Sequence, residues 1–329
     1  MVSGFLVLDN EPFFHLNENE FKQALRKYPE LNSTDNFYLK NSATIHLEPG
    51  KARDGYIDNE LILEQFERLF KLLKFKKSYE NKKIIIIVDN ATTHTAREYT
   101  IKDFSMKSGT KCPVEKITWV QDDVEKSLNC FYPNGLSKGL LVIGRELGLI
   151  KENEKLKLDD LRNKVGEHAA FKNKCKLKLL AERYSVEIIF SPKYHCELNP
   201  IEGLWCFQKV NIRKNTDGTF EKLVELIDKT KEMFQIQNIN IRLWNRFFNT
   251  INDYENDASY EEILKKYCIE KCQSKTRSHF FNNMILQKWN YELDIDTMFD
   301  GSFAGILKQC PTNLSCRFLK STMICNFEL

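Results

Sequence analysis

The chain has 329 residues, 42% of them hydrophobic, which is enough for a substantial buried core and suits one main domain with an appendix. Its 49 basic and 46 acidic residues leave a net charge of only +3, so any nucleic-acid surface must be local. No apolar stretch reaches the ~20 residues of a membrane span, which argues against a helical membrane protein.

The ten cysteines are scattered without regular spacing, and no paired zinc-ligand pattern is present. The first residues, Met1 to Phe5, lack a basic region followed by an apolar one, so no secretory signal is predicted. We therefore expect reduced thiols, an intracellular protein and no zinc site.

Two strands are predicted before the first long helix, at Gly4–Leu8 and Ala43–Leu47, with a polar stretch between them. Asp58 is the expected cap of that helix. Its apolar seam has helical spacing and consists of Ile62, Phe66, Leu69 and Leu73.

Lysines gather at the end of this helix, namely Lys71, Lys74, Lys76 and Lys77. Their position is typical of a solvated helix end that complements the helix dipole, and this is the interpretation we favour. Contact with a DNA backbone is the alternative.

An unbroken β-branched run, Lys83–Val88, leads into Asp89. The run is too short for a helix and predicts a strand buried on both faces of a mixed sheet. A second inner strand is predicted at Val186–Phe190, directly after a helix at Cys175–Tyr184.

Between these strands, residues 100 to 134 are polar and irregular, apart from a possible strand at Ile117–Val120. A helix is predicted at Gly139–Leu147. We expect residues of about 100–175 to form an inserted segment.

Asn199-Pro200-Ile201-Glu202 has the composition of a helix start, with Asn as the cap, Pro in the first turn and an acid at the third position. Further helices are predicted at Thr219–Phe234, Ile241–Tyr254 and Ser259–Cys272. The last of these helices begins with a capping-box pattern of Ser259 and Glu262. From Gln273 the periodicity fades. The predicted organisation is a main domain, 1–254, and a helical C-terminal extension, 255–329.

Asp89 and Glu202 are the candidate metal ligands. If the strands that precede them are neighbours, both carboxylates lie at the carboxyl edge of one sheet, where Mg²⁺ could bridge a phosphate. Taken singly, each has a structural alternative. Asp89 would then form a turn with Asn90, and Glu202 would belong to a capping box.

Two motifs carry a resemblance to a known family: Asp89-Asn90-Ala91-Thr92-Thr93-His94 and the stretch from Ser191 to Trp205. Together they resemble the DDE superfamily endonuclease domain of mariner-like transposases. Residues 49–56 and Phe131-Tyr132-Pro133 are similar to intervening segments of a branch common in fungal genomes. The resemblance covers roughly residues 1 to 254.

The resemblance implies an α/β, ribonuclease H-like mixed sheet flanked by helices and a Mg²⁺- or Mn²⁺-dependent reaction on DNA phosphodiester bonds. Asp89 would be the second metal-binding acid and Glu202 the third, supported by Asn199 and Trp205. The nucleic-acid contacts would be His94, Lys193, Lys209, Arg213 and Lys214. A capping or surface role remains the alternative for His94, and a structural role is expected for His195.

The resemblance also needs a first acid. Residues 1 to 7 resemble the family's second strand, so the chain is expected to begin after that acid and after the upstream helix-turn-helix region. Asp9 is the candidate substitute if the first strand of this chain is also the family's first.

Two functions stay open. One is a DDE endonuclease or transposase domain, whose activity is in doubt without the first acid. The other is a non-catalytic remnant that binds DNA or protein. DNA as partner, no small-molecule substrate, a possible homodimer and nuclear localisation are expected by family analogy only.

Overall fold

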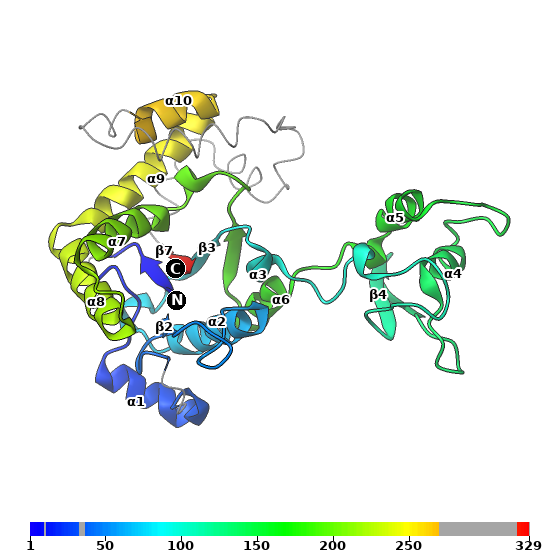
Figure 1. Ribbon diagram of the computed structural model, residues 1–329, viewed down its shortest axis with the longest axis horizontal. Helices are drawn as coiled ribbons and strands as arrows, with labels where there is room; N and C mark the ends of the chain where they lie inside the picture. Colours follow the sequence, from blue (N-terminus) through cyan, green and yellow to red (C-terminus); the bar gives the residue numbers. More distant parts are fainter. Residues whose placement is uncertain (10, 33–36, 270–320, 329) are drawn as a thin grey trace. The chain divides into compact units, whose positions relative to one another are not determined.

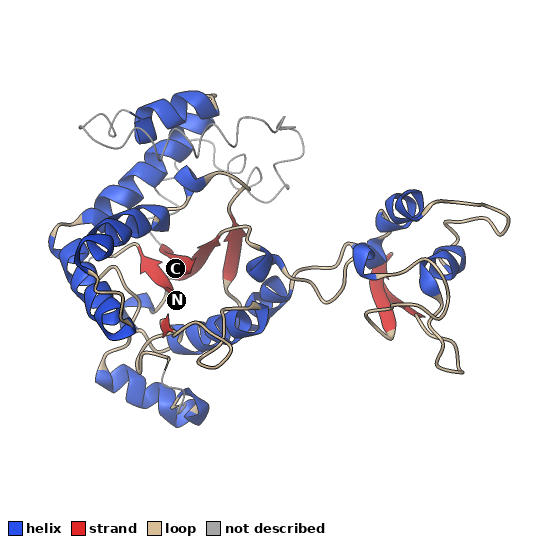
Figure 2. Ribbon diagram, viewed as in Figure 1, coloured by secondary structure: helices blue, strands red, loops and turns tan. Residues whose placement is uncertain are grey.

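The computed structural model describes residues 1–9, 11–32, 37–269 and 321–328, and side chains are described as far as Tyr267. The chain divides into two compact units (Figure 1). The first unit comprises Met1–His94 and Leu180–Leu329, and the second comprises Thr95–Leu179. Figure 2 shows that both units combine helices and strands, which confirms a mixed α/β chain.

A five-stranded sheet in the order β2-β1-β7-β3-β6 forms the centre of the first unit. β7 is antiparallel to β1 and parallel to β3, and β3 is parallel to β6. The strands span Val2–Val7 (β1), Ile45–His46 (β2), Lys83–Val88 (β3), Glu187–Phe190 (β6) and Ser321–Glu328 (β7).

The predicted strands in this unit are confirmed to within a few residues. β3 and β6 are neighbours, with Val88 opposite Phe190. Their β-branched and aromatic residues suit a pleated surface that is covered on both faces.

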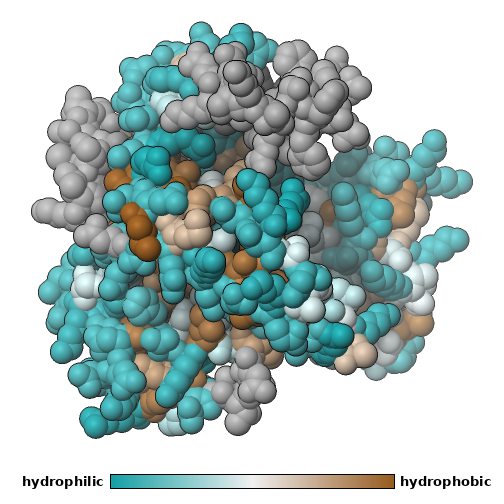
Figure 3. All heavy atoms as spheres, turned by 60° about the vertical axis from the view of Figure 1, so that its left-hand side comes forward, coloured by the Kyte–Doolittle hydropathy of each residue, from teal (hydrophilic) through white to brown (hydrophobic). Residues whose placement is uncertain are grey.

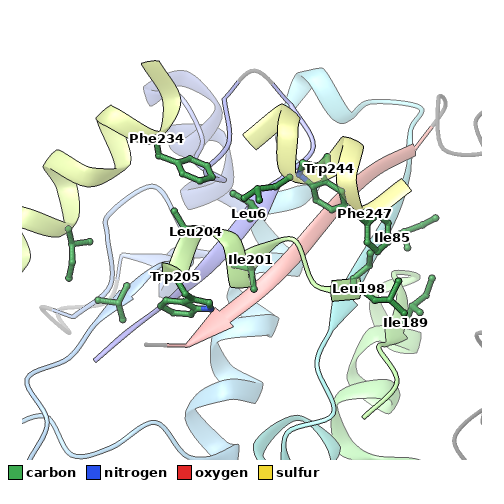
Figure 4. Close-up of a cluster of buried hydrophobic side chains, with 14 of the residues drawn as sticks. Leu6, Ile85, Ile189, Leu198, Ile201, Leu204, Trp205, Phe234, Trp244 and Phe247 are labelled. Carbon is green, nitrogen blue, oxygen red and sulfur yellow. The ribbon is translucent and has the colours of Figure 1, made fainter. Parts of the chain in front are cut away.

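Helices cover both faces of the sheet (Figure 1). On one face Leu6, Ile85 and Ile189 belong to a buried cluster with residues of α7, α8 and α9 (Figure 4). On the other face the Phe5 ring meets the Phe66 ring of α2 edge-on at 5.4 Å between centroids. The sheet is therefore an inner layer between helices.

Most helices of this unit follow the predicted seams, but α1 does not. It has a complete capping box, Asn17 with Glu20, yet only three buried residues in ten, so its apolar stripe is too short to stand out in a polar stretch. The helices of the first unit, with α6 at its border, span Glu18–Lys27 (α1), Asn59–Leu73 (α2), Thr92–Thr95 (α3), Lys176–Tyr184 (α6), Ile201–Asn215 (α7), Phe220–Ile236 (α8), Ile239–Glu255 (α9) and Tyr260–Leu264 (α10).

The expected helical extension is wrong for Ser321–Glu328, which form the central strand β7. Five positions of β7 pair with β1 and five with β3. The β-branched and apolar residues of this octapeptide are compatible with a strand, but its partners lie far away in sequence. The capping box at Ser259 and Glu262 is confirmed, and the helix continues as a π-helical turn at Lys265–Ile269. The rest of the expected extension, 270–320, lies outside the described residues.

The second unit has its own core, in which Tyr99, Phe104 and Phe171 meet edge-on. The possible strand near Ile117 is one arm of an antiparallel hairpin whose other arm was not predicted. The elements span Lys116–Gln121 (β4), Val124–Asn129 (β5), Gly139–Glu146 (α4) and Leu158–Gly166 (α5).

Hydrophilic side chains predominate on the face drawn in Figure 3, with scattered apolar patches. Among the described helices, none is both long enough and apolar enough to cross a bilayer.

Candidate functional site

The carboxyl ends of β3 and β6 are tied together. The Ser191 amide donates to the Val88 carbonyl at 2.8 Å, which extends the parallel ladder by one residue. The Asn90 side-chain amide donates to the Ser191 carbonyl at 3.0 Å. Asp89 thus lies beside the first residue of the loop that leads from β6 to α7.

Asp89 is held by its own motif. Its Oδ1 accepts the Ala91 backbone N–H at 3.0 Å and lies 2.5 Å from Nδ1 of the buried His94. Burial acts to raise the pKa of the Asp89 carboxyl, but the His94 ring and the Ala91 N–H outweigh it, so the pKa falls below its usual value. The Asp89 side chain is still half-exposed, and its Oδ2 carries no hydrogen bond to any described residue.

The position of His94 explains its role in this turn. Its side chain is 2% exposed and its ring lies 6.1 Å from the Phe66 ring of α2. The Asn59 side chain, at the start of α2, donates to the neighbouring Thr93 carbonyl at 2.6 Å. His94 therefore orients Asp89 from within the core and is too buried for a surface contact with DNA.

Glu202 is exposed in the first turn of α7. The helix begins at Ile201, one residue after Pro200, so Glu202 is its second residue rather than the predicted third. Gly203 lets this turn approach α9 closely, because a Cβ there would clash with the side chain of Leu243.

The start of α7 packs on the sheet face that carries Ile87 and Ile189, since Leu198 and Ile201 belong to the same buried cluster (Figure 4). Asp89 adjoins the beginning of the β6–α7 loop, and Glu202 follows its end. The two predicted acids therefore flank one loop, although they are 113 positions apart in sequence.

Asp9 does not join them. Val7 is opposite Ile324 of β7, which in turn is opposite Ile86. Because β1 runs antiparallel to β3 and ends at Val7, Asp9 lies in the turn beyond Val7, toward the amino end of β3. The level of Val7 is that of Ile86, already about 10 Å along the strand from Asp89 at ~3.3 Å per residue, so Asp9 does not substitute for the first acid.

The predicted basic contacts separate into two groups. Lys193 is exposed in the loop, and the Lys209 ammonium lies 5.5 Å from the Trp205 ring on α7. Arg213 and Lys214 are in the last turn of α7, which is roughly 17 Å from Glu202 at 1.5 Å per residue. The first pair therefore lies in the β6–α7 loop and within two turns of Glu202, whereas the second pair lies at the end of the helix.

Local patterns did not reveal a buried network in the β6–α7 loop. The Glu197 side chain is fully buried, and its Oε1 lies 2.6 Å from His195 Nδ1 and accepts the Tyr254 hydroxyl of α9 at 2.8 Å. Burial, followed by the Glu197 charge, raises the pKa of Tyr254, so its hydroxyl remains a donor. This network fixes the loop to α9, and it fits the structural role expected for His195.

Asp89 and Glu202 carry oxygen donors, the type of ligand that Mg²⁺ takes. Within the described residues, no three His, Cys, Asp or Glu side chains come together as a metal-binding group. Mg²⁺ commonly uses one or two carboxylates together with substrate phosphates and water. Asp89 and Glu202 supply carboxylate oxygens at the two ends of the β6–α7 loop, and no preformed two-ion centre is present among the described residues.

Comparison of the chain with models of protein families, with curated proteins and with solved structures finds no match. The interpretation of this site therefore depends on the residues and contacts described above.

Proposed function

We propose that this chain is a DDE-type endonuclease domain of ribonuclease H-like fold, derived from a mariner-like transposase, that acts on DNA phosphodiester bonds with Mg²⁺ or Mn²⁺. The observation that carries the proposal is the parallel pairing of β3 with β6, by which Asp89 lies beside the start of the β6–α7 loop, whose end is followed by Glu202 in the first turn of α7. A mixed sheet with helices on both faces is compatible with this family. Nuclear localisation belongs to the same proposal.

The residues would divide the work as follows. Asp89, oriented by His94 and the Ala91 N–H, and Glu202 would hold the cation on a DNA phosphate. The metal would supply Lewis-acid stabilisation of charge at that phosphate. Lys193 and Lys209 would bind the adjacent backbone, where lysines add affinity without sequence information.

The test is nicking of supercoiled plasmid DNA by the full chain with Mg²⁺ or Mn²⁺. Asp89→Asn and Glu202→Gln should each lower the nicking rate by roughly a hundredfold or more, since each removes an anionic ligand. Glu221→Gln is the matched control, because Glu221 is also the exposed second residue of a helix, α8. Equal nicking by all variants, or none by the wild type, would refute the activity.

A non-catalytic module that binds DNA or protein is the second candidate. It is favoured by the position of Asp9 away from Asp89 and by the finding that, among the described residues, no three potential ligands come together as a metal-binding group. In that case Mn²⁺ titrations followed by electron paramagnetic resonance should show equally weak binding by the wild type and by Asp89→Asn. Clearly tighter binding by the wild type would exclude this function as the complete explanation.

A further inference from the structure

A pocket of about 580 Å³ lies at the opposite edge of the same sheet, where β3 and β6 begin. The end of α2 and the turn before β3 supply most of its wall, and residues 184–187, which lead into β6, complete it. Lysines predominate among its charged residues, namely Lys74, Lys76, Lys77, Lys82 and Lys83. Lys83 and Asp89 are six positions apart on an extended strand, roughly 20 Å, so this pocket is distinct from the acidic site.

The charge of the pocket is largely uncompensated. Glu80 and Glu187 are its two acidic residues, and Glu187 pairs with Lys83. Lys76 donates to the His15 carbonyl at 2.9 Å and lies 3.6 Å from the Glu11 carboxylate. Three further ammonium groups form no ion pair with any residue in the described ranges, and they belong to Lys74, Lys77 and Lys82.

Aromatic rings hold two of these ammonium groups without cancelling their charge. Lys74 Nζ lies 4.9 Å from the centroid of Tyr184, and Lys82 Nζ lies 5.9 Å from that of Tyr79. The Tyr184 hydroxyl donates to Glu67 at 2.7 Å, which fixes the ring. A cation over a ring face is attracted by the ring quadrupole but keeps its full charge for a ligand.

The backbone that carries the lysines is also fixed. The Lys77 amide, which opens the 3₁₀ turn Lys77–Tyr79, donates to Glu20 Oε1 of α1 at 2.9 Å. The Tyr79 side chain is buried beneath this turn. The free ammonium groups are thus arranged on a rigid support rather than on a mobile loop.

We propose that this pocket binds the phosphate backbone of a nucleic acid, with Lys74, Lys77 and Lys82 as the cationic contacts and Tyr184 as the residue that positions Lys74. A nucleic-acid backbone fits better than a small phosphorylated metabolite, because Lys74, Lys77 and Lys82 are exposed residues of the pocket wall and are not buried inside the pocket. Lysines act as point charges, so the site selects for charge and not for base sequence. The inference does not rest on the acidic site.

The experiment is a titration of fluorescein-labelled duplex DNA by fluorescence anisotropy over a series of NaCl concentrations. EDTA is present and no divalent cation is added, so the result is independent of any metal at Asp89. The triple variant Lys74→Ala, Lys77→Ala and Lys82→Ala is compared with a control of equal charge change. The control replaces three exposed lysines of the same unit outside this pocket, Lys51, Lys229 and Lys265.

The pocket variant should bind at least roughly tenfold more weakly, and the slope of log K against log salt should fall by about 2 to 3, one unit for each lost contact. The control should stay within about threefold of the wild type. Equal losses in both variants would overturn the proposal. So would displacement of the DNA by ATP or inorganic phosphate at concentrations far below those of added salt, because the ligand would then be a small anion.

Tyr184 is tested separately, because its role is to position Lys74. Tyr184→Leu removes the ring and should weaken DNA binding about two- to fivefold. Tyr184→Phe keeps the ring and loses only the hydrogen bond to Glu67, so it should restore most of the affinity. Circular dichroism of each variant verifies folding. Equal binding by the Leu and Phe variants would contradict the positioning role.

Discussion

The two ends of the parallel strands β3 and β6, here called the carboxyl edge and the amino edge of the sheet, differ in how their charged side chains are paired. At the carboxyl ends of β3 and β6, Asp89 accepts hydrogen bonds from its own motif and Glu197 is buried with His195 and Tyr254. At the amino ends, Lys74, Lys77 and Lys82 are exposed and form no ion pair with any described residue. The parallel direction of the two strands separates these chemistries by roughly 20 Å. A carboxylate that the fold holds in place suits a site that needs one defined geometry, whereas unpaired lysines suit a site that binds any sequence of phosphates.

The largest effect on stability is expected from removal of the central strand β7. A chain that ends at residue 320 lacks β7, which pairs with β1 on one side and with β3 on the other. Unpaired backbone groups would then face a gap in a buried sheet, so the first unit should lose its cooperative unfolding. Hydrogen exchange should show loss of protection in β1 and β3, while the second unit keeps its protection because it has a separate core.

A synthetic peptide of residues 321–328, added to the shortened chain, is the control for this deletion. It should restore part of the protection in β1 and β3 by occupying the vacant position between them. Unchanged exchange in the shortened chain would show that β7 contributes little to the sheet.

Local sequence was sufficient to predict the strands β3 and β6, because unbroken β-branched runs indicate burial on both faces. That the two strands are neighbours was only a condition of the predicted site, and their parallel pairing is seen in the structure. It was insufficient for β7, since strand order depends on partners that lie more than 200 positions away. Asp9 could be excluded only once the direction of β1 was known. A residue that follows a strand lies at the end of the sheet toward which the strand runs, and β1 runs toward the amino end of β3.

The candidate site was predictable to the same extent. Asp89 and Glu202 are each marked by the element that they end or begin, so both could be selected from the sequence. The partners of Glu197 could not, because Tyr254 is 57 positions away on another helix and neither residue has a distinctive neighbourhood. Contacts between side chains of distant elements leave no periodic signal.

A smaller effect is expected from His46, which lies in β2 opposite Val2 and toward the carboxyl ends of β7 and β3. Burial, followed by the charge of Lys231, lowers the pKa of His46 to about 4, against a smaller opposing effect of Asp228. In the unfolded chain the imidazole takes up its proton near pH 6.5. Between these values the unfolded state binds more protons, so stability falls as the pH falls.

The free energy of unfolding should therefore drop by ~2 kcal/mol between about pH 7.5 and pH 5 through this group. Urea denaturation at a series of pH values measures the drop. His46→Gln should remove most of this drop in the free energy of unfolding. His15→Gln is the control and should leave the drop in place, because the His15 side chain is 44% exposed. A pH dependence that is identical in wild type and His46→Gln would show that the imidazole is not held neutral.

The smallest effect distinguishes the two edges directly. Tyr254→Phe removes the hydroxyl that donates to the buried Glu197 and should lower the free energy of unfolding by about 1 to 2 kcal/mol, because the carboxylate loses a hydrogen-bond donor inside the protein. Lys77→Ala, at the other edge, should change it by less than ~0.5 kcal/mol, since its ammonium group is exposed and has no acidic partner among the described residues. Urea denaturation of both variants gives the comparison, and Tyr56→Phe, whose ring is exposed, controls for the loss of a hydroxyl group. If Tyr254→Phe and Lys77→Ala changed the free energy of unfolding equally, the buried Glu197 network would contribute no more to stability than the exposed Lys77 side chain.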